Sequence, residues 1–239
     1  MEAVYKRVLI KISGEALAGD KKTGFDFDFI STVAETLKTC VEMGVQVGIV
    51  IGGGNFWRGV KDGAGKVERV SADRMGMLAT AMNCLAVADV IKQNGVGAKV
   101  MTAVDIQGVG ERYDTQKSIE YMEKGNVVLF ACGTGHPFFS TDTAAALRAV
   151  EISADAILLA KNIDGVYDDD PRKNPNAVRF DEISYEEVLA RRLAVMDTTA
   201  TSLAMDNNMP VIVFALAEPE NITKVVCGEK LGTDRKSVV

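Results

Sequence analysis

Basic residues and glycines stand at the ends of several apolar segments of this chain. Three consecutive glycines, Gly52–Gly54, directly follow one such segment, and Arg58 comes four residues after them. Lys11 lies near the end of a second segment, and Lys161 follows a third. Glycine lets a ligand approach backbone N–H groups, while lysine and arginine supply positive charge, so this combination can bind phosphate groups. The structural alternative is a flexible turn at the glycines and ordinary strand-end lysines.

A polar loop from Gly133 to Asp142 follows another apolar segment and contains the only histidine of the chain, His136. Asp142 can fix the two lysines by ion pairing, or it can serve only as the N-cap of a helix. His136 is either a ligand contact or a loop residue without a chemical role. A single histidine excludes a His-rich metal site, and a Ser-His-Asp triad would have to use this residue.

Several other features allow both a structural and a functional interpretation. Asp73, near the start of a helix, is favoured there by the helix dipole and can also accept hydrogen bonds from sugar hydroxyls. The run Asp168–Asp170 is either a solvated turn or a contact to magnesium or ribose. We expect Phe138–Phe139 and Trp57 to pack rather than to stack on a base, and the Met-rich segment 75–82 to lie in the core.

The composition excludes several classes of protein. A chain of 239 residues with 47% hydrophobic residues can bury a substantial core. Its net charge of −6 argues against a nucleic-acid polymer as the main partner, because such proteins need a basic face. No apolar run is long enough to cross a membrane, and the start does not resemble a signal peptide. The four scattered cysteines are expected to be reduced, mostly buried thiols of a cytoplasmic protein.

Apolar strands alternate with amphipathic helices, which predicts an α/β fold with a mainly parallel sheet covered on both faces, in a single domain over 1–239. Strands are predicted over 5–13, 45–51, 98–102, 126–131, 155–160 and 210–216. Helices are predicted over 28–42, from Ser71 to near Gly95, over 115–124, from Asp142 to about Ser153, after a Ser184–Glu187 capping box, over 197–207 and over 219–227. The polar tail is expected to fray.

Ligands of open α/β sheets bind beyond the carboxyl ends of the strands. The polar loops described above all begin at such ends, so we expect them to meet in one crevice and to form a cationic pocket for a polyanion. The sequence contains no Walker A motif and no G-x-G-x-x-G after its first strand, which removes the fingerprints of two common nucleotide-binding folds.

Taken together, these loops resemble the amino acid kinase family, and most closely its members that phosphorylate UMP. The resemblance covers nearly the whole chain and is carried by residues 11–17, 50–55, 58–59, 72–83, 133–142, 161, 164–167, 170–171, 195–197 and 228–230. The glycine and lysine motifs are typical of the family at large. The Met-Gly-Met-Leu-Ala-Thr helix and the Pro-Phe-Phe-Ser-Thr-Asp loop are typical of the UMP-phosphorylating members.

The resemblance implies a three-layer α/β/α sandwich that uses ATP with Mg²⁺ and transfers the γ-phosphoryl group to UMP, supplying UDP for pyrimidine nucleotide (CTP) biosynthesis. The acceptor would contact mainly the first half of the chain, and the nucleoside of ATP mainly residues after about 155. The implied ATP contacts are Lys11, Ile12, Ser13, Gly14, Gly54, Arg58, Asn162, Tyr167 and Asp170. The implied UMP contacts are Gly53, Asp73, Thr134, Gly135, His136, Pro137, Phe138, Phe139, Ser140 and Thr141.

The resemblance also implies catalytic roles for Lys11, Arg58 and Lys161, with Asp142 orienting the two lysines. It implies no metal ligand from the protein, because the nucleotide phosphates would carry Mg²⁺. It further implies a homohexamer that GTP activates and UTP inhibits. His136 stands where the family loop usually has Asn, and the segment 19–24 and the tail 236–239 are also less typical of the family.

The residue types suit a phosphate acceptor. The attacking phosphate oxygen of UMP is mostly ionised near neutral pH, since its second pKa is about 6, so the reaction needs no general base. A carboxylate acceptor needs none either, and an amino-acid or other carboxylate kinase of the same family is therefore an alternative. A nucleotide-binding regulatory or storage protein without turnover is another.

Overall fold

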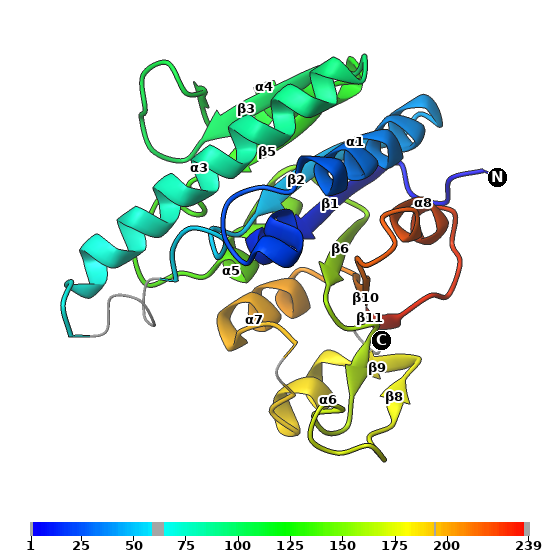
Figure 1. Ribbon diagram of the computed structural model, residues 1–239. Helices are drawn as coiled ribbons and strands as arrows, with labels where there is room; N and C mark the ends of the chain where they lie inside the picture. The colour runs from blue at the N-terminus through cyan, green and yellow to red at the C-terminus, as the bar shows by residue number, and fades with distance from the viewer. Residues whose placement is uncertain (1, 59–64, 194, 237–239) are drawn as a thin grey trace.

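The computed structural model describes residues 2–58, 65–193 and 195–236, and Figure 1 shows their arrangement. The strands are β1 (Arg7–Ile12), β2 (Gln46–Ile51), β3 (Ala98–Thr102), β4 (Glu111–Arg112), β5 (Val127–Ala131), β6 (Ala156–Lys161), β7 (Val166–Tyr167), β8 (Arg179–Phe180), β9 (Glu182–Ser184), β10 (Val211–Ala215) and β11 (Thr233–Lys236). The helices are the 3₁₀ segment η1 (Gly14–Lys21), α1 (Phe27–Glu42), α3 (Arg69–Gln93), α4 (Thr115–Glu123), α5 (Thr141–Glu151), α6 (Tyr185–Ala190), α7 (Thr198–Asp206) and α8 (Asn221–Val226).

One nine-stranded sheet organises the molecule, in the order β4-β3-β5-β2-β1-β6-β10-β11-β9. The first seven strands in this order, β4-β3-β5-β2-β1-β6-β10, are parallel. Their carboxyl ends therefore lie along one edge of the sheet. β1 is central, between β2 and β6, and Lys11 is opposite Val50 on one side and Leu159 on the other. The loops that follow these strands are therefore neighbours in space.

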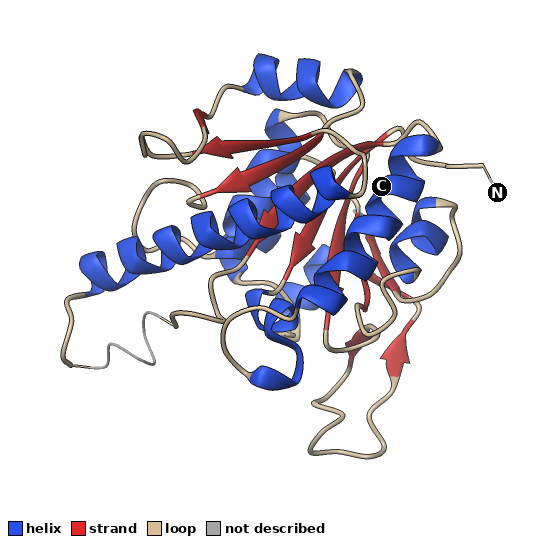
Figure 2. Cartoon of the chain, turned by 45° about the horizontal axis from the view of Figure 1, so that its top comes forward, coloured by secondary structure: helices blue, strands red, loops and turns tan. Residues whose placement is uncertain are grey.

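Helices cover both faces of the sheet and complete three layers (Figures 1 and 2). Both faces must be covered because successive residues of β1 point to opposite faces and are apolar on each. Val8, Ile10 and Ile12 join an apolar core with α1, α3 and α8, while Leu9 points to a second core with α4, α5, α6 and α7. The predicted mainly parallel α/β/α sandwich is confirmed.

Two helices begin at different residues from those predicted. α3 begins at Arg69, with Glu68 before it, so Ser71 lies within the first turn rather than at the cap. The hydroxyl of Ser140 caps α5 by accepting the backbone N–H of Thr143. The interpretation of Asp142 as an N-cap is therefore wrong: Asp142 lies inside the first turn, and its carboxylate remains available for another partner.

The C-terminal segment is ordered as far as Lys236, so the prediction that the whole polar tail frays is wrong. Thr233–Lys236 forms β11, which pairs antiparallel with β10 and parallel with β9. Backbone hydrogen bonds hold such a strand without an apolar pattern. Residues 237–239 of the predicted tail lie outside the described part of the chain.

Several large side chains of α3 do not lie in the core as predicted, although Met77 packs against it. Met75, Leu78, Met82 and Leu85 are 40–53% exposed. The helix instead turns small residues such as Ala81, and also Cys84, toward β2, β3 and β5, where little space separates it from the sheet. Contrary to the expectation that no segment is long and apolar enough to cross a membrane, α3 meets both conditions by length and composition, since a few charged residues do not prevent it. It serves here as a core helix of the sandwich. The prediction of buried thiols holds for Cys40, Cys84 and Cys132, whereas Cys227 is partly exposed, and all four are free.

Candidate active site

A cavity of about 700 Å³ opens at the carboxyl ends of β1, β2 and β5, and we call it the large cavity. It brings together most of the residues that the sequence singles out, namely Lys11, Ser13, Gly14, Gly53, Gly54, Arg58, Asp73, Thr134, His136, Phe138, Phe139, Ser140 and Thr141. All except Asp73, which α3 supplies, follow a strand or lie near its carboxyl end. The loops after β1, β2 and β5 thus meet as expected, but the prediction of a single crevice is wrong for the loop after β6, which lines a separate cavity.

Close contacts between backbone segments explain the glycines of the large cavity. A Cβ at Gly14 would lie 2.2 Å from the carbonyl oxygen of Gly52, and a Cβ at Gly53 would lie 2.9 Å from that of Gly76 in α3. The buried amide of Asn83 donates to the same Gly52 carbonyl at 2.7 Å. Glycine is thus required for close packing of three segments, and the loop is held in place rather than being a flexible turn.

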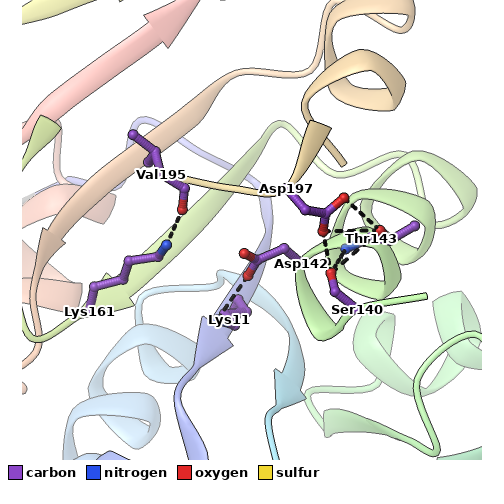
Figure 3. A network of polar contacts seen from close by, with 7 residues as sticks. All are labelled: Lys11, Ser140, Asp142, Thr143, Lys161, Val195 and Asp197. Carbon is purple, nitrogen blue, oxygen red and sulfur yellow. Dashed lines mark hydrogen bonds and ion pairs between the residues drawn. The ribbon is translucent and has the colours of Figure 1, made fainter. Parts of the chain in front are cut away.

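Lys11 lines the large cavity and forms an ion pair with Asp142, which Figure 3 shows. The Lys11 Nζ lies 2.8 Å from Oδ1 of Asp142, and the two side chains are only 12% and 17% exposed. Water screens such a pair weakly, so the geometry of the lysine is well defined. Removing either partner would leave the other charge poorly solvated.

Arg58 lines the same cavity and pairs with Glu15, with Nη2 and Oε1 2.6 Å apart. Both side chains are a little over two-fifths exposed, so the contact is an ordinary partly solvated pair. Sequence reasoning missed Glu15 as a cavity residue. Glu15 lies beside the glycine loop, since a Cβ at Gly54 would lie 3.3 Å from its side chain. The available signal was its position directly after Gly14, at the end of a predicted strand. Gly59, which belongs to the same motif as Arg58, lies outside the described residues.

Asp73 ties the 133–140 loop to α3. Its carboxylate accepts the backbone N–H of Phe138 at 2.7 Å and the Nε of Arg69 at 2.8 Å. The guanidinium of Arg69 also lies over the Phe138 ring, 5.2 Å from its centroid. Phe138 has a φ of 72°, a left-handed conformation that a bulky residue rarely adopts. Such strain persists where surrounding contacts impose it, often at functional sites.

The aromatic residues of the site differ in their packing. Phe138 and Phe139 are 66% and 52% exposed, so the prediction that they are packing residues is wrong. They present flat apolar rings to the large cavity. Trp57 does pack against α3, and its Nε1 donates to the carbonyl oxygen of Ala72 at 2.8 Å.

A second cavity, of about 360 Å³, is lined by Lys161, Tyr167 and Asp170, and we call it the small cavity. The Lys161 Nζ donates to the carbonyl oxygen of Val195 (Figure 3). The Tyr167 hydroxyl donates to Asp164 at 2.8 Å, and this hydrogen bond raises the pKa of Tyr167. Tyr167 therefore stays neutral near pH 7 and offers the cavity a flat polar-edged ring.

The acidic run after β7 forms a turn. Asp168 accepts the backbone N–H of Val178 at 2.7 Å, and Asp170 accepts that of Arg172 at 3.1 Å. The backbone and side-chain hydrogen bonds from Arg172 hold the pKa of Asp170 below its ordinary value. Asp170 is thus ionised near neutral pH at the rim of the small cavity.

Asp197, which sequence reasoning did not place in the site, links the two cavities. It caps α7 by accepting the N–H of Ala200, and its carboxylate also accepts the hydroxyls of Ser140 and Thr143 (Figure 3). Two residues earlier, Val195 accepts Lys161. The segment before α7 therefore touches both the small-cavity lysine and the start of α5. An aspartate at the first position of the helix predicted over 197–207 was the available signal.

Not every predicted site residue lines a cavity. Lys11 and Arg58 share the large cavity, whereas Lys161 lines the small one. The side chain of Ile12 is buried in the core, and its carbonyl oxygen accepts the N–H of Gly52. Asn162, Gly135, Pro137 and Asp142 do not line either cavity, and Asp142 acts instead through Lys11.

The fold and the site define a class: three-layer α/β/α sandwiches whose site lies beyond the carboxyl ends of a mainly parallel sheet. Residues 6–215 match the amino acid kinase family model, and the chain belongs to this family.

Three solved structures are similar to the chain over nearly its full length. The UMP kinase from Bacillus anthracis is 36% identical with a TM-score of 0.94, and the match covers 98% of this chain and 97% of that one. The UMP kinase from Ureaplasma parvum is also 36% identical, with a TM-score of 0.92 and coverage of 97% and 99%. The uridylate kinase from Archaeoglobus fulgidus is 28% identical, with a TM-score of 0.74 and coverage of 95% and 99%.

Proposed function

We propose that this protein is a UMP kinase that transfers the γ-phosphoryl group of ATP directly to the phosphate of UMP. The observation that carries the proposal is the position of Lys11, paired with Asp142 at the end of the central strand and lining the cavity that also contains the glycine loop and Arg58. The likeness to two UMP kinases over nearly the full length of both chains supports the choice of acceptor.

In this proposal the large cavity holds UMP and the phosphates of ATP, and the small cavity holds adenosine. The UMP contacts are Gly53, Asp73 and residues 134–141, where Asp73 accepts hydrogen bonds from ribose hydroxyls and the two exposed phenylalanines face the base. Lys11, Ser13, Gly14, Gly54 and Arg58 contact the ATP phosphates. Tyr167 and Asp170, with Asn162 beside them, contact adenosine.

The chemistry requires charge neutralisation rather than proton removal. Two unit charges about 4 Å apart repel by about 4 kcal/mol at an effective dielectric near 20, so two phosphates do not approach unaided. Lys11 and Arg58 supply the opposite charge, and Lys161 does so from the neighbouring strand. Arg58 exchanges Glu15 for phosphate when the ligand binds.

Mg²⁺ would be carried by the nucleotide. In the described part of the chain no group of three or more His, Cys, Asp or Glu side chains could hold a metal ion. When bound to the ATP phosphates, Mg²⁺ neutralises part of their charge. The protein residues then orient the two phosphate groups in line.

An ADP-release assay with ATP–Mg²⁺ across UMP, CMP, dTMP, N-acetylglutamate and aspartate tests the proposal. We expect kcat/KM for UMP to exceed that for each other acceptor by at least about 100-fold, because a site that hydrogen-bonds its substrate discriminates strongly against analogues lacking the partner. Cytosine changes the hydrogen-bonding edge of the base, dTMP lacks the ribose 2′-hydroxyl that Asp73 would contact, and the two amino-acid acceptors lack the nucleoside. A preference for either amino-acid acceptor would make the chain a carboxylate kinase. Nucleotide binding without ADP release from any acceptor would make it a regulatory or storage protein.

We also propose that the chain assembles into a homohexamer in the cytoplasm, activated by GTP and inhibited by UTP. The effector response rests on the resemblance alone and is checked by adding each nucleotide to the assay. For assembly, a second observation offers support. Met75, Leu78, Met82 and Leu85 form an exposed apolar stripe along α3, and such stripes commonly mark contact surfaces between chains.

Replacing Leu78 and Met82 together by Glu should lower the molar mass of the assembly, because paired carboxylates cannot be buried in an apolar interface. Sedimentation velocity provides the measurement. Gln116→Glu, at an exposed position of α4 on the opposite face of the sheet, is the control and should leave the mass unchanged. A monomeric wild type, or an unchanged mass in the Leu78→Glu/Met82→Glu variant, would contradict a contact through α3.

A further inference from the structure

A buried arginine lies behind the loop that follows β5. Arg148, on α5, is 5% exposed, and its Nη2 donates to the carbonyl oxygen of Gly133 at 3.3 Å. Gly133 is the second residue after β5 and lines the large cavity, whereas Arg148 does not line it. The contact thus joins α5, in the helical layer formed by α4, α5, α6 and α7, to the start of the 133–140 loop.

Two neighbours fix the orientation of Arg148. Its Nη1 lies 2.5 Å from Oε2 of Glu151, and its guanidinium stacks on the Tyr113 ring, 3.7 Å from the centroid. The Tyr113 hydroxyl donates to the same Glu151 oxygen at 2.7 Å. The ring also makes an edge contact with Phe130 of β5, with centroids 5.7 Å apart. A planar guanidinium stacked on one side and hydrogen-bonded at its edge has little freedom to turn.

Tyr113, Glu151 and Arg148 form a hydrogen-bonded group whose charges balance. Burial raises the pKa of Tyr113 to about 12, so its hydroxyl stays protonated and donates to Glu151 near neutral pH. Glu151 accepts from both neighbours, and its negative charge compensates the buried guanidinium.

The backbone at the start of the loop needs such support. Cys132 has a φ of 66° and Gly133 a φ of 59°, so two consecutive residues adopt the left-handed region, which a side chain disfavours at Cys132. On the side of α3, the Thr80 hydroxyl accepts the N–H of Cys132 at 2.8 Å. On the side of α5, Arg148 holds the next carbonyl. Helices from both layers therefore clamp the same turn.

The Gly133 contact also sets the direction of the next peptide. A peptide unit is planar and trans, so the N–H of Thr134 points opposite to the carbonyl of Gly133. Since that carbonyl faces Arg148, the Thr134 N–H faces away from it. Thr134 lines the large cavity, where the proposed acceptor binds.

We propose that Arg148 is a positioning residue for the acceptor: held by Tyr113 and Glu151, it fixes the Gly133–Thr134 peptide and thereby the loop that receives UMP. This inference rests on the proposed function. A positioning role differs from a purely structural one in its effect on the two substrates. Loss of Arg148 should weaken binding of the acceptor but not of ATP, whose nucleoside is proposed to lie in the small cavity.

Steady-state kinetics of Arg148→Met test it, with Arg7→Met as the matched control. Arg7 is also poorly exposed and donates to a backbone carbonyl, that of Ile152, but it lies at the amino end of β1. We expect Arg148→Met to raise the KM for UMP at least about tenfold and to leave the KM for ATP within about twofold. Arg148→Lys should recover part of the loss, since an ammonium can donate to Gly133. Arg7→Met should leave both KM values within about twofold.

A second variant covers the case in which Arg148→Met does not fold. Tyr113→Phe removes one hydroxyl, keeps the ring and should raise the KM for UMP in the same direction by a few fold. Equal shifts in the two KM values, or an unchanged KM for UMP in every variant that folds, would overturn the proposal. Wild-type activity is measured first: if another acceptor is preferred, the proposed function fails, and the same variants test Arg148 with that acceptor.

Discussion

Replacing Lys11 by Met should lower kcat by about 10²–10³-fold while ATP still binds. This range is typical for removal of one preorganised group that stabilises transition-state charge. Lys11 is the basic residue of the large cavity that lies on the central strand, directly between the loops of β2 and β6. The loss should appear in kcat more than in the KM for ATP, because the glycine loop and Arg58 still hold the phosphates.

The same substitution should also destabilise the fold. Asp142 would lose its partner while only 17% exposed, and an unpaired, poorly solvated charge of this kind reduces the free energy of unfolding by about 1–3 kcal/mol. Chemical denaturation measures this loss. ATP binding by calorimetry shows that the variant is folded under assay conditions. A kcat within about tenfold of the wild type would show that Lys11 does not act on the moving phosphoryl group.

Gly14→Ala should be the second most damaging single change. Its Cβ would lie 2.2 Å from the carbonyl oxygen of Gly52 and 2.8 Å from Oδ1 of Asn55. Because both neighbours are held in place, the two loops must move apart. We expect a loss of about 1–3 kcal/mol in the free energy of unfolding and at least a 100-fold loss of kcat/KM, on the order of what a misplacement of about 1 Å produces.

Gly44→Ala provides the matched control for Gly14→Ala. Gly44 has a φ of 84°, a Cβ added there would have no atom within 4 Å, and the residue precedes β2 at the opposite end from the cavity. The substitution should cost about 1–2 kcal/mol through left-handed strain and leave kcat/KM unchanged. If both variants lose activity in proportion to stability, the close approach of the two loops has no special role in the site.

The positions of the main elements follow from local signals. Each of the six predicted strands lies within two residues of its predicted bounds, because buried parallel strands are continuous apolar runs. The C-terminal ends of three helices were equally clear from the sequence. Gly44, Gly95 and Gly125 have φ values of 84°, 86° and 75° just after α1, α3 and α4, as expected of glycines that end helices.

Two features could not be predicted from the sequence: which side of α3 faces the sheet, and the strand β11. The first depends on the distance between helix and sheet, and the second on backbone hydrogen bonds. α3 has apolar residues on more than one side, and periodicity does not tell which side approaches the sheet. The side of α3 that approaches the sheet is the one rich in alanine, and the stripe of Met75, Leu78, Met82 and Leu85 is left exposed. β11 contains the polar residues Thr233, Asp234, Arg235 and Lys236, so its pairing with β10 leaves no apolar pattern.

The site was predictable to the extent that topology determines it. Lys11 and the glycine loop meet because β1 and β2 are parallel neighbours. Pairings between loops were not predictable, since they depend on conformations that residue types do not specify. The contact of Asp73 with the Phe138 N–H, for example, occurs at a phenylalanine with a positive φ, which the residue type does not favour. The division of the basic residues between two cavities, with Lys161 in the smaller, depends equally on loop structure.

The central claim is that Lys11 acts on the phosphoryl group during its transfer and is not merely half of a structural ion pair. The most direct test is the kcat of the Lys11→Met/Asp142→Asn double variant, in which neither residue leaves a buried charge behind. We predict that the second change restores stability toward that of the wild type while kcat stays at the level of Lys11→Met. Recovery of kcat together with stability would contradict the account.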